Sequence, residues 1–429
     1  MQDTLSFKAL FPLTRPRTRE QALLILAGAF TLAGFVQLGI ANPLSIRPVL
    51  YGVGAFAWIM VFAAAHIILN RFLPGRDPML LPIVGLLTGW GLLEVARLSQ
   101  TDFPRQTIWM FVGAAAMLAV AAAPRELRWL RRYRYTWLIG GLALLAATFL
   151  FGVNPSGRGQ ELWLGFGGVF FQPSEIVKLL MVVFLASYLA EKRDLQLVMR
   201  VPPGSMNLAY LAPMLAMWGV AMAMLLLQQD LGAAVLLFLA FLVMLYLASG
   251  RWHYLAIGAA LLVVGVFIGY ILVGRVHERV NTWLDPWAHA ELESYQVVQS
   301  LIGIGSGGLI GAGLGLGDPV VPAAHTDMPL AVIGEEFGLL GSVGLVLCYT
   351  LLTLRGLRAA ARSRTVFGAL LAAGLATLIG VQAWIIMAGN INLIPLAGIT
   401  LPFVSYGGSS MLISFVMVGL LLHVSADID

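Results

Sequence analysis

Residues 21–41 read QALLILAGAFTLAGFVQLGIA, a stretch that contains no charged side chain. A helix of about 20 mostly apolar residues is long enough to span the hydrocarbon core of a bilayer. The stretch follows a polar, basic segment, as a signal peptide would, but it exceeds the h-region of about 7–15 residues and lacks an A-x-A-like end. It therefore predicts a membrane-spanning helix that is retained in the protein.

The rest of the chain repeats this pattern. Hydrophobic residues make up 59% and charged residues 11% of the 429 residues, and the mean hydropathy is +0.88. Soluble domains carry about 25% charged residues. The expected spans are 20–42, 47–71, 79–97, 106–124, 136–153, 172–191, 207–226, 231–249, 253–273, 328–354, 366–389 and 403–424. We therefore predict an all-α integral membrane protein, a polytopic bundle of about twelve transmembrane helices.

The distribution of Lys and Arg predicts the orientation of this bundle. With a cytoplasmic N-terminus, nineteen of these residues fall in the inner segments and six in the outer ones. Such an excess marks the cytoplasmic side of bacterial inner-membrane proteins. The sequence pI of about 9.5 comes from short basic clusters between apolar runs, which suit membrane lipid headgroups and argue against a nucleic-acid partner.

The outer segments hold the less usual sequence. They comprise 154–172, the break at 228–230, a long loop at 274–327, and 390–402. Long loops in compact proteins are usually functional or disordered. Because the 274–327 loop contains Trp283, Trp287, Tyr295 and the apolar run VVQSLIGIG, we expect it to be ordered and to form interfacial helices.

Charged residues near the outer ends of the spans need an explanation, because a charge at the centre of a bilayer helix costs about 2.5–3.5 kcal/mol on insertion scales. Glu175 and Lys178, in QPSEIVK, lie three residues apart and share one helix face. They are either a self-neutralising structural pair or part of a polar cavity that opens outward. Asp230, in QQDLGAA, is either a helix N-cap or a third member of that cavity.

The segment HTDMPLAVIGEEFG places His325 and Asp327 where the long loop meets the next span. Glu335 and Glu336 lie two turns deeper, where at least one must find a partner inside the bundle. Asp327 could serve as a helix cap. A His-x-Asp on the same side as the other charges suggests a site instead.

Small residues begin the last span, in LPFVSYGGSS. Ser405, Gly407 and Ser409 permit close helix packing, or they present hydroxyls and backbone amides to a phosphate. The sequence leaves both interpretations open.

Five motifs, taken in order, resemble the SEDS family (shape, elongation, division and sporulation), the RodA/FtsW-type proteins. They are WLGFGGVFFQPSEIVK, QQDLGAA, YQVVQSLIGIGSGGLIGAGLG, HTDMPLAVIGEEFGLLG and LPFVSYGGSS. The resemblance implies a ten-helix core at 76–429 with its large extracytoplasmic loop at 274–327. It leaves 20–75 as two additional N-terminal helices after a cytoplasmic tail at 1–19.

The resemblance also implies an activity and roles for residues. The family's members are peptidoglycan glycosyltransferases that polymerise lipid II on the outer face of the cytoplasmic membrane beside a class B penicillin-binding protein. Asp327 matches the family's essential aspartate, Glu175 and Lys178 its polar pair, Asp230 the aspartate of its second motif, and Trp163 the tryptophan before QPSE. The chain departs from the family pattern at Leu162, Gln229 and Ala312.

The reaction that this implies needs a base and a cationic site. Conversion of an α-linked pyrophosphate donor into a β-1,4 linkage is one inversion, so the acceptor hydroxyl must lose its proton during the displacement. We expect Asp327 to be the general base. The pyrophosphate would be held by Lys178, Arg275, Arg279 or a divalent cation such as Mg²⁺ or Mn²⁺, with His325 positioning the loop. Two alternatives are a lipid II transporter, or flippase, and a non-catalytic scaffold for the penicillin-binding protein.

Overall fold

The computed structural model describes residues 16–41, 47–123, 127–155, 157, 160–198, 208–318 and 321–426. Within these residues, eleven helices are long and apolar enough to cross a membrane. The expected span at 207–226 corresponds to helix α8 (Leu208–Leu227), whose apolar part Ala212–Leu227 is shorter. The prediction of a polytopic helical membrane protein is confirmed.

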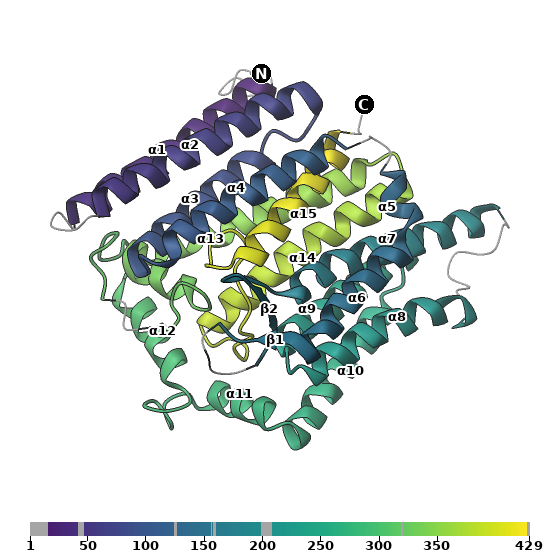
Figure 1. Cartoon of the computed structure of the whole chain (residues 1–429). Coiled ribbons are helices and arrows are strands. Elements are labelled where there is room, and N and C mark those ends of the chain that lie inside the picture. The colour runs from purple at the N-terminus through teal and green to yellow at the C-terminus, as the bar shows by residue number, and fades with distance from the viewer. Residues whose placement is uncertain are drawn as a thin grey trace, which may run out of the picture.

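The elements follow one another as a helical bundle with one small sheet (Figure 1). The first half comprises α1 (Pro16–Ala41), α2 (Arg47–Phe72), α3 (Leu80–Leu98), α4 (Asp102–Ala121), α5 (Arg128–Arg132), α6 (Arg134–Phe151), β1 (Gly152–Val153), β2 (Trp163–Phe166) and β3 (Val169–Phe171). The second half comprises α7 (Pro173–Val198), α8, α9 (Leu231–Ser249), α10 (His253–Leu272), α11 (Gly274–Leu284), α12 (Tyr295–Ser306), α13 (Pro329–Arg362), α14 (Val366–Asn390) and α15 (Gly408–Ala426).

Helix α14 lies at the centre of the bundle and packs against α7, α9, α13 and α15. Most of its residues are buried, whereas α10 is almost wholly exposed at the periphery, where an apolar surface suits lipid. The two N-terminal helices lie side by side on α3 and α4 (Figure 1). The bundle therefore has a protein-covered centre and a lipid-facing rim.

Helices α11 and α12 lie at the end of the bundle where α13 begins, and the C-terminal end of α15 lies at the opposite end (Figure 1). We call the first of these ends the loop side. The 274–327 loop is ordered and contains the helices α11 and α12, and their interfacial position stays a prediction. They lie outside the eleven candidate spans.

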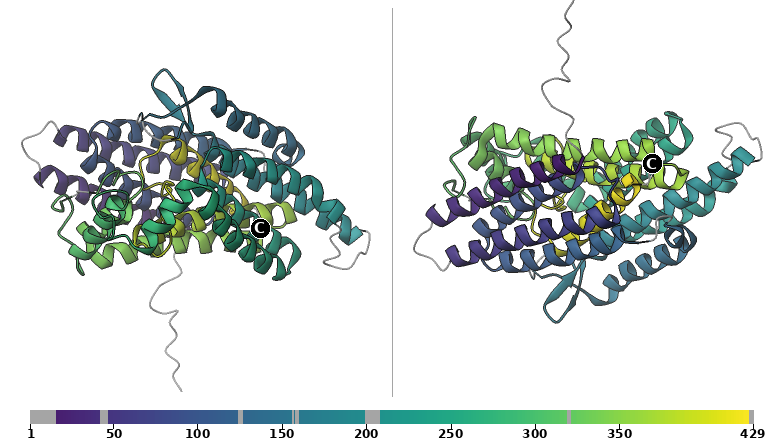
Figure 2. Two further views of the ribbon diagram at one scale, coloured as in Figure 1. Left: turned by 90° about the horizontal axis from the view of Figure 1, so that it is seen from below. Right: turned by 90° about the horizontal axis from the view of Figure 1, so that it is seen from above.

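A three-stranded antiparallel sheet, β1-β2-β3, replaces part of the loop expected at 154–172. Leu164 pairs with Gly152 on one side and with Phe171 on the other. Gly167 and Gly168 both have positive φ, which is the two-residue turn that suits a β-hairpin. Figure 2 shows the sheet projecting from the bundle. Strands were not part of the sequence prediction, because the aromatic–glycine run was interpreted as a loop.

Helix α13 changes direction at Gly338, where φ is +64°. A Cβ at this position would lie 2.4 Å from the Gly311 backbone nitrogen. Glycine is therefore required here by both conformation and space. The close approach seats the loop after α12 against the kink of α13.

Candidate active site

Asp327 occupies the last part of the long loop, two residues before α13 begins. Its backbone N–H donates to the Ala323 carbonyl at 3.0 Å, and its own carbonyl accepts from the Asn390 side chain at 2.9 Å. Asn390 also accepts from the Leu330 N–H at 3.1 Å. Met328, and not Asp327, is the N-cap of α13, and its side chain forms no cap bond.

The charge that acts on the Asp327 carboxylate comes from helix α11. Burial raises the pKa of the Asp327 carboxyl, while a hydrogen bond from Thr326 and the charge of Arg279 lower it. Arg279 lies on α11, and its guanidinium donates to the Ala397 carbonyl at 2.9 Å. Burial also lowers the pKa of Arg279, against the attraction of Asp327 and Asp230. The Arg279 charge therefore interacts electrostatically with both carboxylates, while Arg275 opposes that effect.

Asp230 joins this group from the break between α8 and α9. One of its oxygens accepts from the Ala233 N–H at 3.1 Å, so the N-cap interpretation is correct. The other oxygen is buried and has no hydrogen-bond partner among the described residues. The residue thus caps α9 and still directs an unsatisfied carboxylate oxygen toward the interior, which is costly without a partner.

Glu175 and Lys178 form a buried ion pair of 2.8 Å on α7. The Lys178 ammonium also donates to the Gln382 side chain at 3.1 Å, and Gln382 donates to the Thr400 carbonyl at 2.7 Å. Thr400 and the Arg279 acceptor Ala397 belong to the same segment between α14 and α15. This segment connects the ion pair with the Arg279 group.

His325 contacts a residue that the sequence argument did not select. Its ring lies 3.5 Å from the Asp102 carboxylate and packs against Tyr406, with ring centroids 5.8 Å apart. Burial lowers the pKa of His325, and Asp102 raises it. The Tyr406 N–H donates to the His325 carbonyl at 2.7 Å, so both ends of His325 are held. The acid in the first turn of α4 was the available signal for Asp102.

The small residues near the start of α15 are engaged with the protein. The Ser405 hydroxyl accepts from the Leu401 N–H, and that of Ser409 accepts from the Gln172 N–H, each at 2.9 Å. A Cβ on Gly407 would lie 3.2 Å from Thr400. In this arrangement they serve close packing, and their phosphate-binding role stays a prediction.

The structure places two other predicted residues beside the β-sheet. Trp163 lies in β2, paired with Val153. The Arg275 guanidinium donates to Gln160, whose amide donates to Gln229 at 2.7 Å. Arg275 therefore ties α11 to the segment before β2 and to the α8–α9 break.

Glu335 and Glu336 lie apart from this group, as a separate buried cluster. Glu336 pairs with Arg97 and accepts from the Gly315 N–H at 3.1 Å, and Glu335 accepts from the Asp318 N–H at 2.6 Å. Both acids therefore find partners within the bundle, as expected. They hold the glycine-rich loop after α12 against α3 and α13.

Helices long enough to span a membrane, with the charges of Asp327, Arg279 and Asp230 interacting at one end of the bundle, define an integral membrane protein with a polar site at that end. Residues 79–428 match the model of the FtsW/RodA/SpoVE family, described as a cell cycle protein. The chain belongs to this family, so the predicted SEDS membership is confirmed.

Several proteins resemble the chain over most of its length. It is 38% identical to "Peptidoglycan glycosyltransferase RodA" of Mycobacterium leprae, covering 96% of this chain and 91% of the relative. It is 36% identical to "Probable peptidoglycan glycosyltransferase FtsW" of Geobacter metallireducens, over 75% of this chain and 84% of that one.

Solved structures share the fold. A chain from a study of "polymerization and crosslinking by a peptidoglycan synthase complex" matches with a TM-score of 0.70 and 26% identity, over 82% of this chain and 98% of that chain. The rod shape determining protein RodA of Thermus thermophilus matches with a TM-score of 0.61 and 26% identity, over 82% and 97%.

Proposed function

We propose that this protein is a peptidoglycan glycosyltransferase that joins the disaccharide units of lipid II into β-1,4 glycan strands on the outer face of the cytoplasmic membrane. The names of its relatives and the shared family support the reaction class. The observation that supports the site is the position of Asp327 directly before α13, where its charge interacts with that of Arg279.

In the proposed reaction, the 4-hydroxyl oxygen of the acceptor sugar attacks the anomeric carbon of the donor. The bond from that carbon to the pyrophosphate oxygen breaks as the new glycosidic bond forms, with inversion. The hydroxyl proton passes to the Asp327 carboxylate. A pKa raised by burial suits a base, because a more basic carboxylate is a better proton acceptor.

The leaving pyrophosphate needs positive charge. Arg275 and Arg279 lie on one helix and offer guanidinium groups, which suit phosphate oxygens, and the charge of Arg279 interacts with Asp327. The Lys178 ammonium already donates hydrogen bonds to Glu175 and Gln382. Its positive charge therefore acts on the pyrophosphate together with the negative charge of Glu175. His325, held by Asp102 and Tyr406, positions the end of the loop rather than the reacting atoms.

A divalent cation, Mg²⁺ or Mn²⁺, was a further candidate for the pyrophosphate. Among the described residues no three His, Cys, Asp or Glu side chains form a metal-binding cluster. Mg²⁺ commonly binds through one or two carboxylates together with substrate phosphates, so a cation at this site would be held chiefly by the pyrophosphate. Chelation with EDTA followed by addition of Mg²⁺ or Mn²⁺ tests whether the substrate itself needs a cation.

The class B penicillin-binding protein is the proposed partner, since one matching structure comes from a complex for polymerisation and crosslinking. A crosslinking enzyme needs strands, and this chain would supply them. The alternatives are a transporter of lipid II and a scaffold without catalysis. The transporter predicts charges throughout the bilayer depth, with important residues on both faces, and the scaffold predicts that Asp327 is dispensable.

The test uses purified protein, its partner and labelled lipid II. Asp327→Asn should lower polymerisation by about 10²–10⁴-fold, because it removes the proton acceptor and keeps the shape. Asp285→Asn is the matched control, since Asp285 is an exposed aspartate of the same loop whose side chain accepts from the nearby Ala288 N–H. Undiminished polymer from Asp327→Asn would remove Asp327 as the base.

A further inference from the structure

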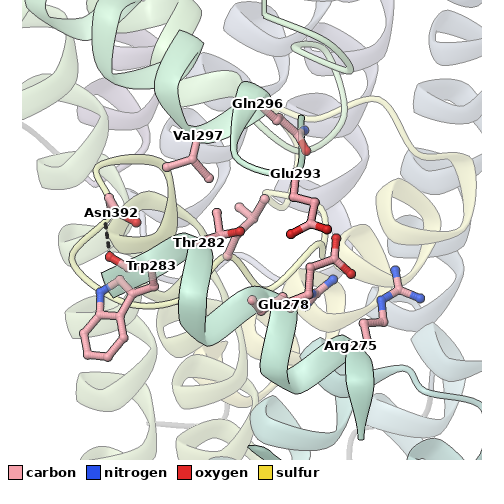
Figure 3. Close-up of a pocket in the computed structure, with 10 residues that line it drawn as sticks. Arg275, Glu278, Thr282, Trp283, Glu293, Gln296, Val297 and Asn392 are labelled. Atoms are coloured by element: carbon pink, nitrogen blue, oxygen red, sulfur yellow. Dashed lines mark hydrogen bonds between the residues drawn. The ribbon is translucent and has the colours of Figure 1, made fainter. Parts of the chain in front are cut away.

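A cavity at the loop side belongs to the proposed substrate site. Its lining includes Glu278 and Glu293 together with Arg275 and Arg279, the arginines proposed to bind the pyrophosphate (Figure 3). The tip of the β-sheet, residues 166–169, does not line this cavity. The exposed surface of that tip therefore needs a separate explanation.

The tip of the β2–β3 hairpin is apolar and not packed against the protein. Phe166 is 90% exposed and Val169 55%, and the two residues pair across the turn formed by Gly167 and Gly168. No atom lies within 4 Å of a Cβ position at either glycine. Residues 162–171, LWLGFGGVFF, contain no charged side chain. Covering such a surface is favourable, because it removes apolar area from water.

The sheet lies at the loop side and projects sideways from the bundle. Strand β3 is followed by Gln172, whose N–H donates to the Ser409 hydroxyl at 2.9 Å. Ser409 begins α15, whose C-terminal end lies at the side opposite the loop side. Figure 2 shows the sheet leaving the bundle across the direction of the helices. An element that leaves a membrane bundle sideways at the helix ends extends along the bilayer surface.

The apolar surface of the sheet continues the lipid-facing surface of α6. This helix is a candidate span, and most of it is not covered by protein. Its last residues, Phe149, Leu150 and Phe151, are exposed, and β1 follows directly with the exposed Val153. Lipid is the solvent that suits the exposed end of an apolar span. The same solvent therefore reaches the sheet.

The open edges of the sheet limit how deeply it can lie. Strands β1 and β3 are its edge strands, with two and three residues. Open sheet edges do not occur in the hydrocarbon region, because their backbone groups would lack hydrogen-bond partners there. The backbone of the sheet therefore belongs in the headgroup region, where water reaches its edges, and only the side chains of the tip can enter the acyl boundary.

We propose that the β2–β3 hairpin is a membrane anchor, whose Phe166 and Val169 side chains insert into the surface of the lipid bilayer on the loop side. The segment before β2 is bonded to α11 and to the α8–α9 break, through Gln160 with Arg275 and Gln229. The anchor therefore fixes the height of α11 above the bilayer. This assignment does not depend on the glycosyltransferase reaction.

The test measures where the tip lies, with the full chain in vesicles of phosphatidylethanolamine and phosphatidylglycerol. Phe166→Cys, in a Cys348→Ala background, carries an environment-sensitive fluorophore. Its fluorescence should be largely lost to a lipid with a spin label high on the acyl chain and little affected by iodide in the water. Leu150→Cys, at the exposed end of α6, should behave alike. Glu161→Cys, exposed two residues before β2, should show the reverse.

A second variant tests whether the apolar side chains hold the sheet in place. Val169→Cys carries the fluorophore with and without Phe166→Asp. The added charge should lower quenching by the spin-labelled lipid and raise quenching by iodide, because a charged side chain is costly to bury in lipid.

Three outcomes would overturn the proposal. Quenching of the Phe166→Cys probe by iodide alone would place the tip in water. Protection from both quenchers would show that a protein surface, from a second copy or from the crosslinking partner, covers the tip. Unchanged lipid quenching of the Val169→Cys probe after Phe166→Asp would show that the bundle alone fixes the sheet, so that the tip is no anchor.

Discussion

Arg279 is the residue that links the separate parts of the site, because its charge interacts with Asp327 and Asp230 and its guanidinium donates to the segment before α15. The positive charge of Arg279 attracts each carboxylate, and the arginine is itself partly buried. Removing the Arg279 charge should therefore raise the pKa of the Asp327 carboxyl, because that charge lowers it.

Arg279→Gln should move the acidic limb of the pH–rate profile to higher pH. The base form of Asp327 is lost as pH falls through its pKa, and Arg279 holds that pKa down against burial. Without the positive charge, protonation begins at a higher pH. Polymerisation rates measured across pH for Arg279→Gln and Arg279→Lys check this, since lysine keeps the charge. An acidic limb that shifts equally in both variants would contradict it.

Lys178 and Glu175 give a prediction on stability. Lys178→Met leaves the Glu175 carboxylate buried without its cation, which should destabilise the protein by about 3–5 kcal/mol. Glu175→Gln/Lys178→Met should regain most of that loss, because no charge then remains in the interior. Thermal unfolding in detergent measures both. A double variant as unstable as the single one would show that the pair holds more than its own charges.

Among the elements, α13 depends on its kink. The Gly338 turn lets the loop after α12 approach the backbone of α13. The Glu335 and Glu336 carboxylates, just before the kink, then accept hydrogen bonds from backbone N–H groups of that loop. The kink thus determines where the helix presents its first turns, next to Asp327. A straight α13 would carry the glycine-rich loop away from α3.

Gly338→Ala should lower stability by more than about 1–2 kcal/mol, the ordinary cost of a left-handed conformation in an L-residue. The added methyl also meets the Gly311 backbone at 2.4 Å, and backbone yields less than a side chain. Gly344→Ala in the same helix is the control, because no atom lies within 4 Å of its Cβ position. Equal unfolding temperatures for the two variants would contradict the role of the kink.

At the scale of the whole molecule, the two N-terminal helices are an integral part of the bundle, because they pack against α3 and α4. A Cβ on Gly34 of α1 would lie 2.4 Å from Leu93 of α3 and 3.2 Å from Leu314 in the glycine-rich loop. Near the other end of α1, Glu20 is buried and bonds Arg76 at 2.5 Å and His66 at 2.6 Å.

Gly34→Leu should therefore destabilise the protein by about 1–3 kcal/mol, because it forces extra volume between packed helices. Gly39→Leu on the same helix should be close to neutral, since its Cβ position has no atom within 4 Å. Thermal unfolding in detergent compares them. If both variants unfold with the wild type, α1 is not a fixed part of the bundle.

The spans, the interfacial helices and the family could be predicted from sequence, because hydrophobicity and motif spacing are properties of contiguous residues. Asp327, Asp230 and Lys178 were selected for the same reason, as ionisable groups near apolar runs. The β-sheet at 152–171 was missed, since its aromatic and glycine residues also suit a loop. Asp102 and Gln382 were missed because their roles depend on contacts with His325 and Lys178, which are distant from them in the sequence.

The amino-acid order by itself determined that this chain crosses a membrane many times and which scarce charges it carries, because each helix must bury its own backbone polar groups in lipid. Only the tertiary structure decided that Arg279 interacts with the charges of Asp327 and Asp230, that Lys178 reaches Gln382, and that Glu278 and Glu293 line one cavity. Those pairings depend on how the helices pack, and packing is set by contacts between residues far apart in the chain.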